Sequence, residues 1–142
     1  GCESDRWGDR EGEGADNGSR DRTAVVVVGD FNVAPGDRDV WDPAAFGGAT
    51  HVTAAERSAL ARIIDLGMVD VFRERFAEDG LHTWWDYRGG AFHKGEGLRI
   101  DLILASSPMA TVLDWVVVDR NERKGEKPSD HAPLVAEFAT AG

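Results

Sequence analysis

The clearest pattern along the chain is the succession of apolar runs separated by short polar or glycine-rich stretches. The run from Val25 to Val28 contains four β-branched residues in succession, which predicts a short strand buried on both faces. Gly29 follows and gives the backbone room to turn, and Asp30 and Asn32 come next. Because side chains alternate along an extended backbone, the carboxylate and the amide should point to the same side.

The same periodicity predicts the remaining elements. The segment Thr53 to Glu56 matches a capping box, and the apolar spacing after it predicts a helix from about 54 to 66 with Gly67 as its terminator. Ser107-Pro108 opens a short helix. Alternation predicts strands over residues 82–87, 98–104, 113–118 and 134–138. Several strands are joined too closely for parallel crossovers, so we expect an α+β fold with a mixed, mostly antiparallel β-sheet and helices on one face.

Composition limits the fold and the setting. The 142 residues are 42% hydrophobic and 30% charged, which suits one soluble globular domain. No apolar run approaches the roughly 20 residues of a membrane span. The single Cys2 cannot form an internal disulfide, which fits a reducing compartment and predicts a cytoplasmic protein. Residues 1–22 are acidic, rich in glycine and poor in apolar side chains, so we expect a disordered segment there and a folded domain over 23–142.

Net charge qualifies the choice of partner. The formal charge of −10 disfavours tight non-specific binding to nucleic acid. It does not exclude a site in which several carboxylates hold a cation that then meets a phosphate. We therefore treat the charge as a mild argument against a nucleic-acid partner.

Polar residues interrupt the predicted strands at three places. Asp30 and Asn32 end the valine strand, and together they indicate either a hard-cation or phosphate site or an ordinary Asp/Asn turn. Asp101 lies on a strand face and needs a partner, which is either Arg99 on the same face or a histidine that the fold brings in. The Asp130-His131 pair is consistent with a functional site and also with a solvated turn.

Two metal-binding patterns can be set aside. A calcium loop starting at Asp30 fails because Ala34 and Pro35 stand where such a loop needs an oxygen ligand and a glycine. The histidines and Cys2 lack the spacing of a zinc site.

Four strings in register resemble one family. GDFNVAP, TWWDYR, GLRIDLILAS and EKPSDHAPL, in this order, are similar to the exodeoxyribonuclease III family of AP endonucleases, a branch of the endonuclease/exonuclease/phosphatase superfamily. The resemblance covers about residues 24 to 139. It implies half of a four-layered α/β sandwich, a divalent cation that is usually Mg²⁺ (Mn²⁺ is possible), and hydrolysis of DNA phosphodiesters in base-excision repair.

The resemblance also implies what this chain lacks. It matches only the C-terminal half of the family's fold, and the Asn, Glu and Tyr that the first half supplies to the site have no counterpart in residues 1–23. The expected partners are therefore the missing N-terminal half of the same fold and double-stranded DNA with abasic sites or 3′ ends. We expect no interaction with a membrane. We expect the chain to be inactive alone.

The roles of individual residues follow from the resemblance. The implied catalytic residues are Asp30, which orients and deprotonates the attacking water, Asn32, which donates to a phosphate oxygen, Asp101 and His131. The implied metal site consists of Asp30, Asn32, Asp130 and His131. His131 contacts the scissile phosphate while Asp101 accepts its other ring N–H. The implied substrate contacts are the aromatic wall of Trp84 and Trp85, with core packing as the alternative, and Arg99 on a phosphate.

Two other functions stay open. A phosphatase or lipid phosphodiesterase of the same superfamily shares the GDFN and SDH-type motifs, although TWWDYR and GLRIDLILAS favour the DNA enzyme. A non-catalytic remnant that binds without cleaving is the other, because half of the metal-binding set is absent.

Overall fold

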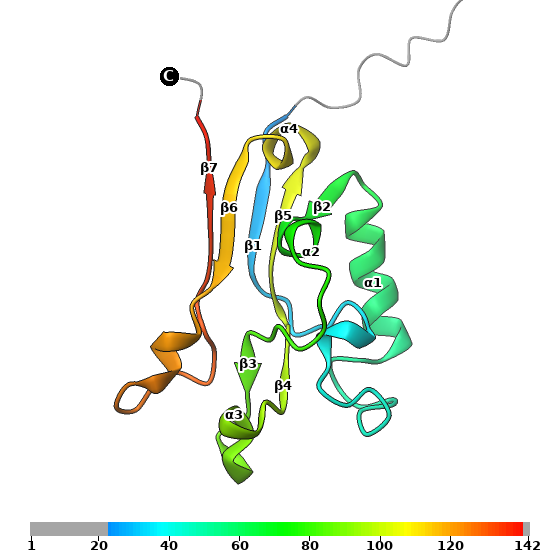
Figure 1. The fold of residues 1–142 in the computed structure, drawn as a ribbon. Coiled ribbons are helices and arrows are strands. Elements are labelled where there is room, and N and C mark those ends of the chain that lie inside the picture. The colour runs from blue at the N-terminus through cyan, green and yellow to red at the C-terminus, as the bar shows by residue number, and fades with distance from the viewer. Residues whose placement is uncertain (1–22, 141–142) are drawn as a thin grey trace, which may run out of the picture.

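The computed structural model describes residues 23–140 (Figure 1). The predictions for residues 1–22 and for Cys2 lie outside this range. The strands are β1 (Val26–Asp30), β2 (Met68–Asp70), β3 (Trp84–Trp85), β4 (Gly97–Leu98), β5 (Asp101–Ser106), β6 (Leu113–Val118) and β7 (Leu134–Phe138). The helices are α1 (Ala54–Ile64), α2 (Val71–Arg75), α3 (Ala91–Lys94) and α4 (Ser107–Ala110), with 3₁₀ turns η1 (Asp37–Asp39), η2 (Arg88–Gly90) and η3 (Arg120–Lys124).

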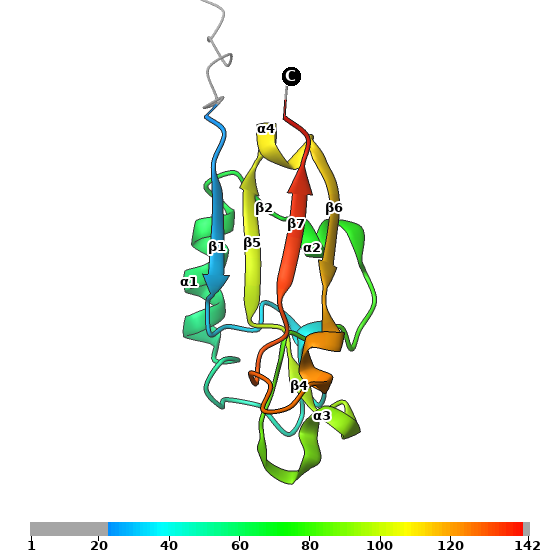
Figure 2. The ribbon, with the colours of Figure 1, turned by 90° about the vertical axis from the view of Figure 1, so that its left-hand side faces the viewer.

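The strands pair antiparallel throughout the described residues. One sheet has the order β1-β5-β2, and two ribbons are formed by β3 with β4 and by β6 with β7. The ribbon of β6 and β7 lies beside β5, and β3, β4 and α3 extend beyond one end of the sheet (Figure 2). The expected α+β fold with mostly antiparallel strands is confirmed.

Helix α1 begins at the predicted capping box. The Thr53 hydroxyl accepts a hydrogen bond from the Glu56 N–H, and the Glu56 carboxylate accepts one from the Thr53 N–H. The helix ends at Ile64, two residues before the predicted end, and Gly67 follows with a φ of +107° that favours glycine. No helix among residues 23–140 is long and apolar enough to cross a membrane.

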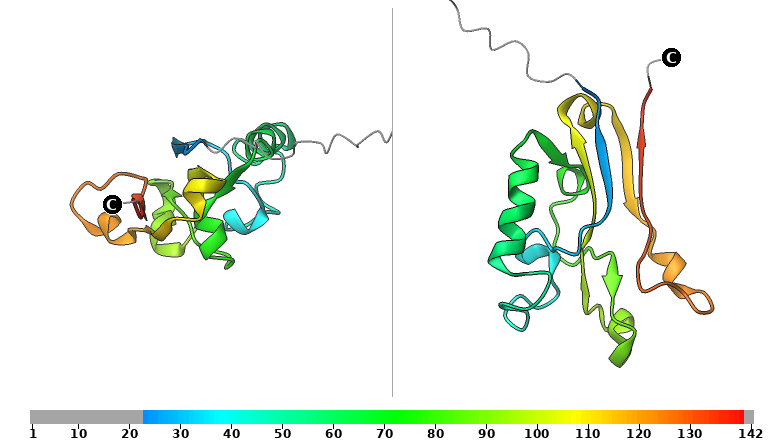
Figure 3. Two further views of the ribbon diagram at one scale, coloured as in Figure 1. Left: turned by 90° about the horizontal axis from the view of Figure 1, so that it is seen from above. Right: turned by 180° about the vertical axis from the view of Figure 1, so that it is seen from behind.

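Strand β5 is the centre of the core. Leu102 and Leu104 pack with Leu60 of α1, whereas the alternate residue Ile103 packs with Phe72 of α2. Because neighbouring residues of a strand point to opposite faces, the two helices contact both faces of β5. We expected the helices on one face of the sheet, whereas α1 and α2 lie on opposite faces of β5 (Figure 3).

Strand β1 differs from its prediction. All five residues of β1 are exposed, and Val28 is 64% exposed, so the expected burial on both faces is wrong for this chain. In the described part of the chain β1 pairs only with β5 and forms an edge of the sheet. Four β-branched residues predict a strand, but their burial depends on what packs against them.

The predicted strand 98–104 is divided in two. Leu98 in β4 pairs with Trp84, whereas Asp101 in β5 pairs with Asp30. Between them the Arg99 N–H donates to the Asp39 carbonyl at 2.9 Å, which interrupts the ladder. The break places the start of β5 directly opposite the end of β1.

Candidate active site

Three polar side chains meet where β1 ends, β5 begins and the chain approaches β7. Asp30 and Asp101 are directly opposite each other on the antiparallel strands, and His131 forms an isolated bridge to Trp84. Two like charges placed opposite each other are destabilising unless a cationic group lies near them. His131 reaches this position from a segment 30 residues after Asp101 in the sequence.

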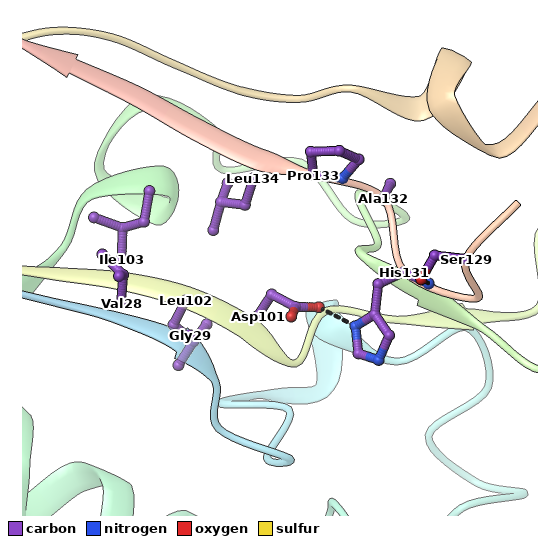
Figure 4. Close-up of a pocket in the computed structure, with 10 residues that line it drawn as sticks. All are labelled: Val28, Gly29, Asp101, Leu102, Ile103, Ser129, His131, Ala132, Pro133 and Leu134. Atoms are coloured by element: carbon purple, nitrogen blue, oxygen red, sulfur yellow. Dashed lines mark hydrogen bonds and ion pairs between the residues drawn. The ribbon is translucent and has the colours of Figure 1, made fainter.

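The imidazole of His131 lies between the two carboxylates. Its Nδ1 is 2.8 Å from Oδ2 of Asp101, and the two side chains point toward each other at one end of a pocket (Figure 4). Its Nε2 is 3.8 Å from Oδ2 of Asp30. The Asp101 contact fixes the orientation of the ring and leaves Nε2 directed toward Asp30. The Asp30 side chain is 36% exposed, so the site is open to solvent.

The turn after β1 holds Asp30 and Asn32 together. The Asn32 N–H donates to Oδ1 of Asp30 at 2.8 Å, and Asn32 has a φ of +52°. His51 holds this turn from outside, because its Nδ1 lies 2.7 Å from the Asn32 carbonyl and its own carbonyl accepts from the Ala34 N–H. Sequence reasoning missed His51, since no local pattern connects it with a residue 19 positions earlier.

Asp130 lies next to the three residues with its carboxylate turned toward Trp84. The Trp84 indole N–H donates to Oδ2 of Asp130 at 3.0 Å, and the Trp85 backbone N–H donates to the Asp130 carbonyl. The segment before β7 is therefore anchored on strand β3, which places His131 beside Asp101.

The donor atoms suit a divalent cation. Among residues 23–140, Asp30, Asp101 and His131 form a group in which one ligand atom from each lies within 4.8 Å of the others. Carboxylate oxygens are the ligands that Mg²⁺ and Mn²⁺ prefer. Of the predicted metal set, Asp30 and His131 belong to this group and Asn32 is held beside Asp30, whereas the Asp130 carboxylate lies outside the group and faces Trp84.

Arg99 lies outside the site and needs a correction. Its side chain is 0% exposed, and its guanidinium contacts Asp39 and Asp70, each at 2.7 Å, while Arg73 also contacts Asp39. Burial acts to lower the pKa of Arg99, but the hydrogen bonds and charges of Asp70 and Asp39 outweigh it and raise the pKa. Arg99 therefore cannot reach a phosphate, and it does not pair with Asp101.

The two tryptophans have different surroundings. Trp85 is buried among Ala91, Ala132 and Phe92, so it is a core residue and not part of an exposed aromatic wall. Trp84 is half-buried, and its ring lies 6.2 Å from that of His51. Only Trp84 of this pair keeps the predicted position beside the site.

Comparisons with known proteins agree on one group. Residues 3–131 match the Endonuclease/Exonuclease/phosphatase family. The chain is 35% identical over 124 residues to exodeoxyribonuclease III of Haemophilus influenzae, an alignment that covers 80% of this chain and 45% of the relative.

Solved structures show the same likeness. The 3′ phosphatase NExo from Neisseria, bound to a product DNA hairpin, superposes with a TM-score of 0.80 at 44% identity over 82% of this chain and 46% of that chain. An AP endonuclease from Archaeoglobus fulgidus gives a TM-score of 0.80 at 40% identity, over 84% and 47%.

The chain spans about half the length of the relatives it matches. The expectation that it corresponds only to the C-terminal half is not supported, because the family match already begins at residue 3.

Proposed function

The chain belongs to the endonuclease/exonuclease/phosphatase family, and we propose that it forms part of a metal-dependent nuclease that hydrolyses DNA phosphodiesters. The activity proposed is that of a 3′→5′ exonuclease and AP endonuclease of base-excision repair. The observation that supports it most strongly is the position of His131 between Asp30 and Asp101 in an open site. Similarity to exodeoxyribonuclease III and to an AP endonuclease supports the choice of DNA over other phosphate esters.

Asp30 acts on the attacking water. One of its oxygens accepts the Asn32 N–H, and the other faces His131 and solvent. A carboxylate held in this way can orient a water molecule and take its proton as the water attacks phosphorus. Asn32 donates its side-chain amide to a phosphate oxygen, where negative charge develops.

His131 contacts the scissile phosphate through Nε2. Its other ring nitrogen is bonded to Asp101, so the ring keeps one orientation during the reaction. Trp84 borders the site and offers an apolar surface to a sugar that has lost its base. Asp101 is thus a positioning residue, and Asp30, Asn32 and His131 are the groups that touch reacting atoms.

Mg²⁺, or Mn²⁺ in its place, would be held by the carboxylates of Asp30 and Asp130 with Asn32 and His131 nearby, and when bound it neutralises charge on the phosphate. The ligand atoms of Asp30, Asp101 and His131 lie close together and support such a cation, whereas the Asp130 carboxylate, bonded to the Trp84 indole, would have to turn from that ring to join them. The further ligands come from the other half of the same fold, which we propose as the intramolecular partner of this chain.

The exposed strand β1 supports a partner of this kind. Its valine side chains and its unpaired edge, within the described residues, offer an apolar surface that more of the same fold would cover. Relatives about twice as long are consistent with it. We expect this chain alone to cleave little or no DNA, and the longer protein to cleave it. A cytoplasmic location remains a prediction.

Two alternatives are kept. A phosphatase is favoured by one observation, namely that the Neisseria structure at 44% identity is described as a 3′ phosphatase. A non-catalytic remnant fits a chain that holds only part of the metal-binding set.

The test compares substrates with the longer protein that contains this chain. Labelled duplexes with an internal abasic site, with a 3′ phosphate or with a plain 3′ end, and an inositol phosphate, are incubated with Mg²⁺ or with EDTA. We expect Mg²⁺-dependent cleavage of the abasic duplex and shortening from the 3′ end. Turnover of the 3′ phosphate alone selects the phosphatase, turnover of the inositol phosphate alone overturns the DNA assignment, and no turnover selects the remnant.

A further inference from the structure

We propose that Arg123 is a positioning residue that holds the segment carrying Asp130 and His131 in its binding geometry. The inference rests on the proposed function, because it assigns a role to a residue outside the site through the loop that enters it. Arg123 lies in η3, beside the β3–β4 ribbon and α3 (Figure 2).

Arg123 is buried among aromatic rings. Its guanidinium lies over Phe92 at 4.9 Å, over Tyr87 at 5.6 Å and over Trp85 at 5.9 Å from the ring centroids. Within residues 23–140 it forms no ion pair, and its Nε has no hydrogen-bond partner. Burying a cation without an anionic partner costs free energy, and here the π faces of the three rings and the Ser129 carbonyl are the groups that compensate it.

The loop before His131 supplies the reason. Three successive carbonyls of this loop accept hydrogen bonds from the aromatic cluster, which consists of Trp85, Tyr87 and Phe92, and from Arg123, which lies over its rings. The Pro128 carbonyl accepts from the Tyr87 hydroxyl at 2.8 Å, the Ser129 carbonyl accepts from Arg123, and the Asp130 carbonyl accepts from the Trp85 N–H at 3.0 Å. Arg123 provides the middle of these three anchors and at the same time stacks on the residues that provide the other two.

The consequence concerns the groups that follow the anchors. With the carbonyls of residues 128–130 fixed, the backbone that carries the Asp130 carboxylate and the His131 imidazole has little freedom to move. Partners that orient ligands in this way are worth about 10- to 100-fold in metal affinity or activity. A planar guanidinium can stack on rings and donate in its own plane, whereas a lysine ammonium cannot do both.

The chain contains a matched control. Arg120 lies in the same turn, and its guanidinium is over Phe92 at 4.9 Å and over Trp85 at 5.4 Å. In the described part of the chain it donates no hydrogen bond to the loop before His131. Arg120→Lys therefore removes stacking on the same rings but leaves the loop anchor intact.

The experiment measures Mn²⁺ binding directly, by electron paramagnetic resonance, in the longer protein that contains this chain. We expect Arg123→Lys to weaken binding about 10-fold and Arg120→Lys to change it less than about 2-fold. The Mg²⁺ concentration for half-maximal cleavage should rise in parallel for Arg123→Lys, while KM for DNA stays unchanged. Thermal unfolding of both variants separates these effects from lost stability.

The outcomes are distinguishable. Equal Mn²⁺ affinity in wild type and Arg123→Lys, with or without a fall in melting temperature, makes Arg123 a packing residue only and overturns the inference. Equal weakening in both variants attributes the effect to the aromatic cluster and also overturns it. Wild-type protein that binds no Mn²⁺ refutes the proposed metal site, and this inference fails with it.

Discussion

Arg99 and Asp101 lie two residues apart and belong to two opposite kinds of charged cluster. Arg99 is completely buried, and both of its acidic partners, Asp39 and Asp70, are also shielded from solvent. Asp101 joins Asp30 and His131 in a cluster whose members stay partly exposed. In the first cluster every charge has a partner, whereas in the second Asp30 faces an imidazole at 3.8 Å.

The difference shows what separates a structural acid from a functional one. A carboxylate that is bonded to a guanidinium and shielded from solvent is not accessible to a water molecule or a metal ion. A carboxylate that is held from one side and open on the other keeps that capacity. Pairing and access, and not the presence of charge, distinguish the two clusters.

The largest effect on activity is expected in the open cluster, at Asp30. We expect Asp30→Asn to lower cleavage by about 10³-fold, because the substitution removes the group that takes the proton of the attacking water. Stability should change little, since an amide can still accept the Asn32 N–H. The measurement is kcat on the preferred duplex, together with urea unfolding, for the longer protein that contains this chain. Retained activity would remove Asp30 from the mechanism.

The closed cluster should respond in the opposite way. Arg99→Leu leaves Asp70 shielded from solvent without its guanidinium partner and Asp39 with Arg73 alone, and it should cost about 3–5 kcal/mol of unfolding free energy. Urea unfolding monitored by circular dichroism measures this cost. Asp39→Asn serves as the second variant, and a loss below about 1 kcal/mol in both would show that the network is dispensable.

His82 is a third kind of polar group, buried without either pairing or access. Burial lowers the pKa of His82 from 6.5 to about 4, and its Nε2 has no partner among the described residues. Because the unfolded chain takes up the proton first, stability should fall as pH decreases from 6.5 toward 4, by about 3 kcal/mol.

The stability–pH curve of His82→Asn provides the comparison. This variant should lose about 3 kcal/mol less than wild type over the same interval. Parallel curves for the two proteins would contradict the low pKa of His82.

The smallest effect is expected at an exposed ion pair. Arg57 and Asp37 are 2.9 Å apart, but the Asp37 side chain is 73% exposed. Asp37→Asn should change the unfolding free energy by less than about 0.5 kcal/mol, since solvent screens such pairs. Differential scanning calorimetry can check this. A loss comparable to that of Arg99→Leu would mean that burial does not govern these contacts.

Local patterns predicted local structure well. The Thr53–Glu56 capping box, the bounds of β6 and β7 and the alternation within β5 all depend on residues close in sequence. The resemblance also brought Asp30, Asp101 and His131 together, although no periodicity connects them. The roles of these residues stay predictions.

What failed depends on distant packing. The local sequence around Arg99 fits an exposed arginine as well as a buried one. Only the fold brings Asp39 and Asp70 to it, from 60 and 29 residues away. The burial of Trp85 and the exposure of Val28 likewise depend on which segments cover them. Sequence periodicity assigns a face to a side chain, but it does not say whether that face is covered.

The hydrogen bond from Trp84 to Asp130 gives the site a built-in optical signal. An indole that donates to a carboxylate changes its emission when that carboxylate is drawn toward a cation. Titrating metal into the protein while following intrinsic fluorescence therefore monitors Asp130 without a dye, and Trp84→Phe identifies the share of the signal that comes from this bond.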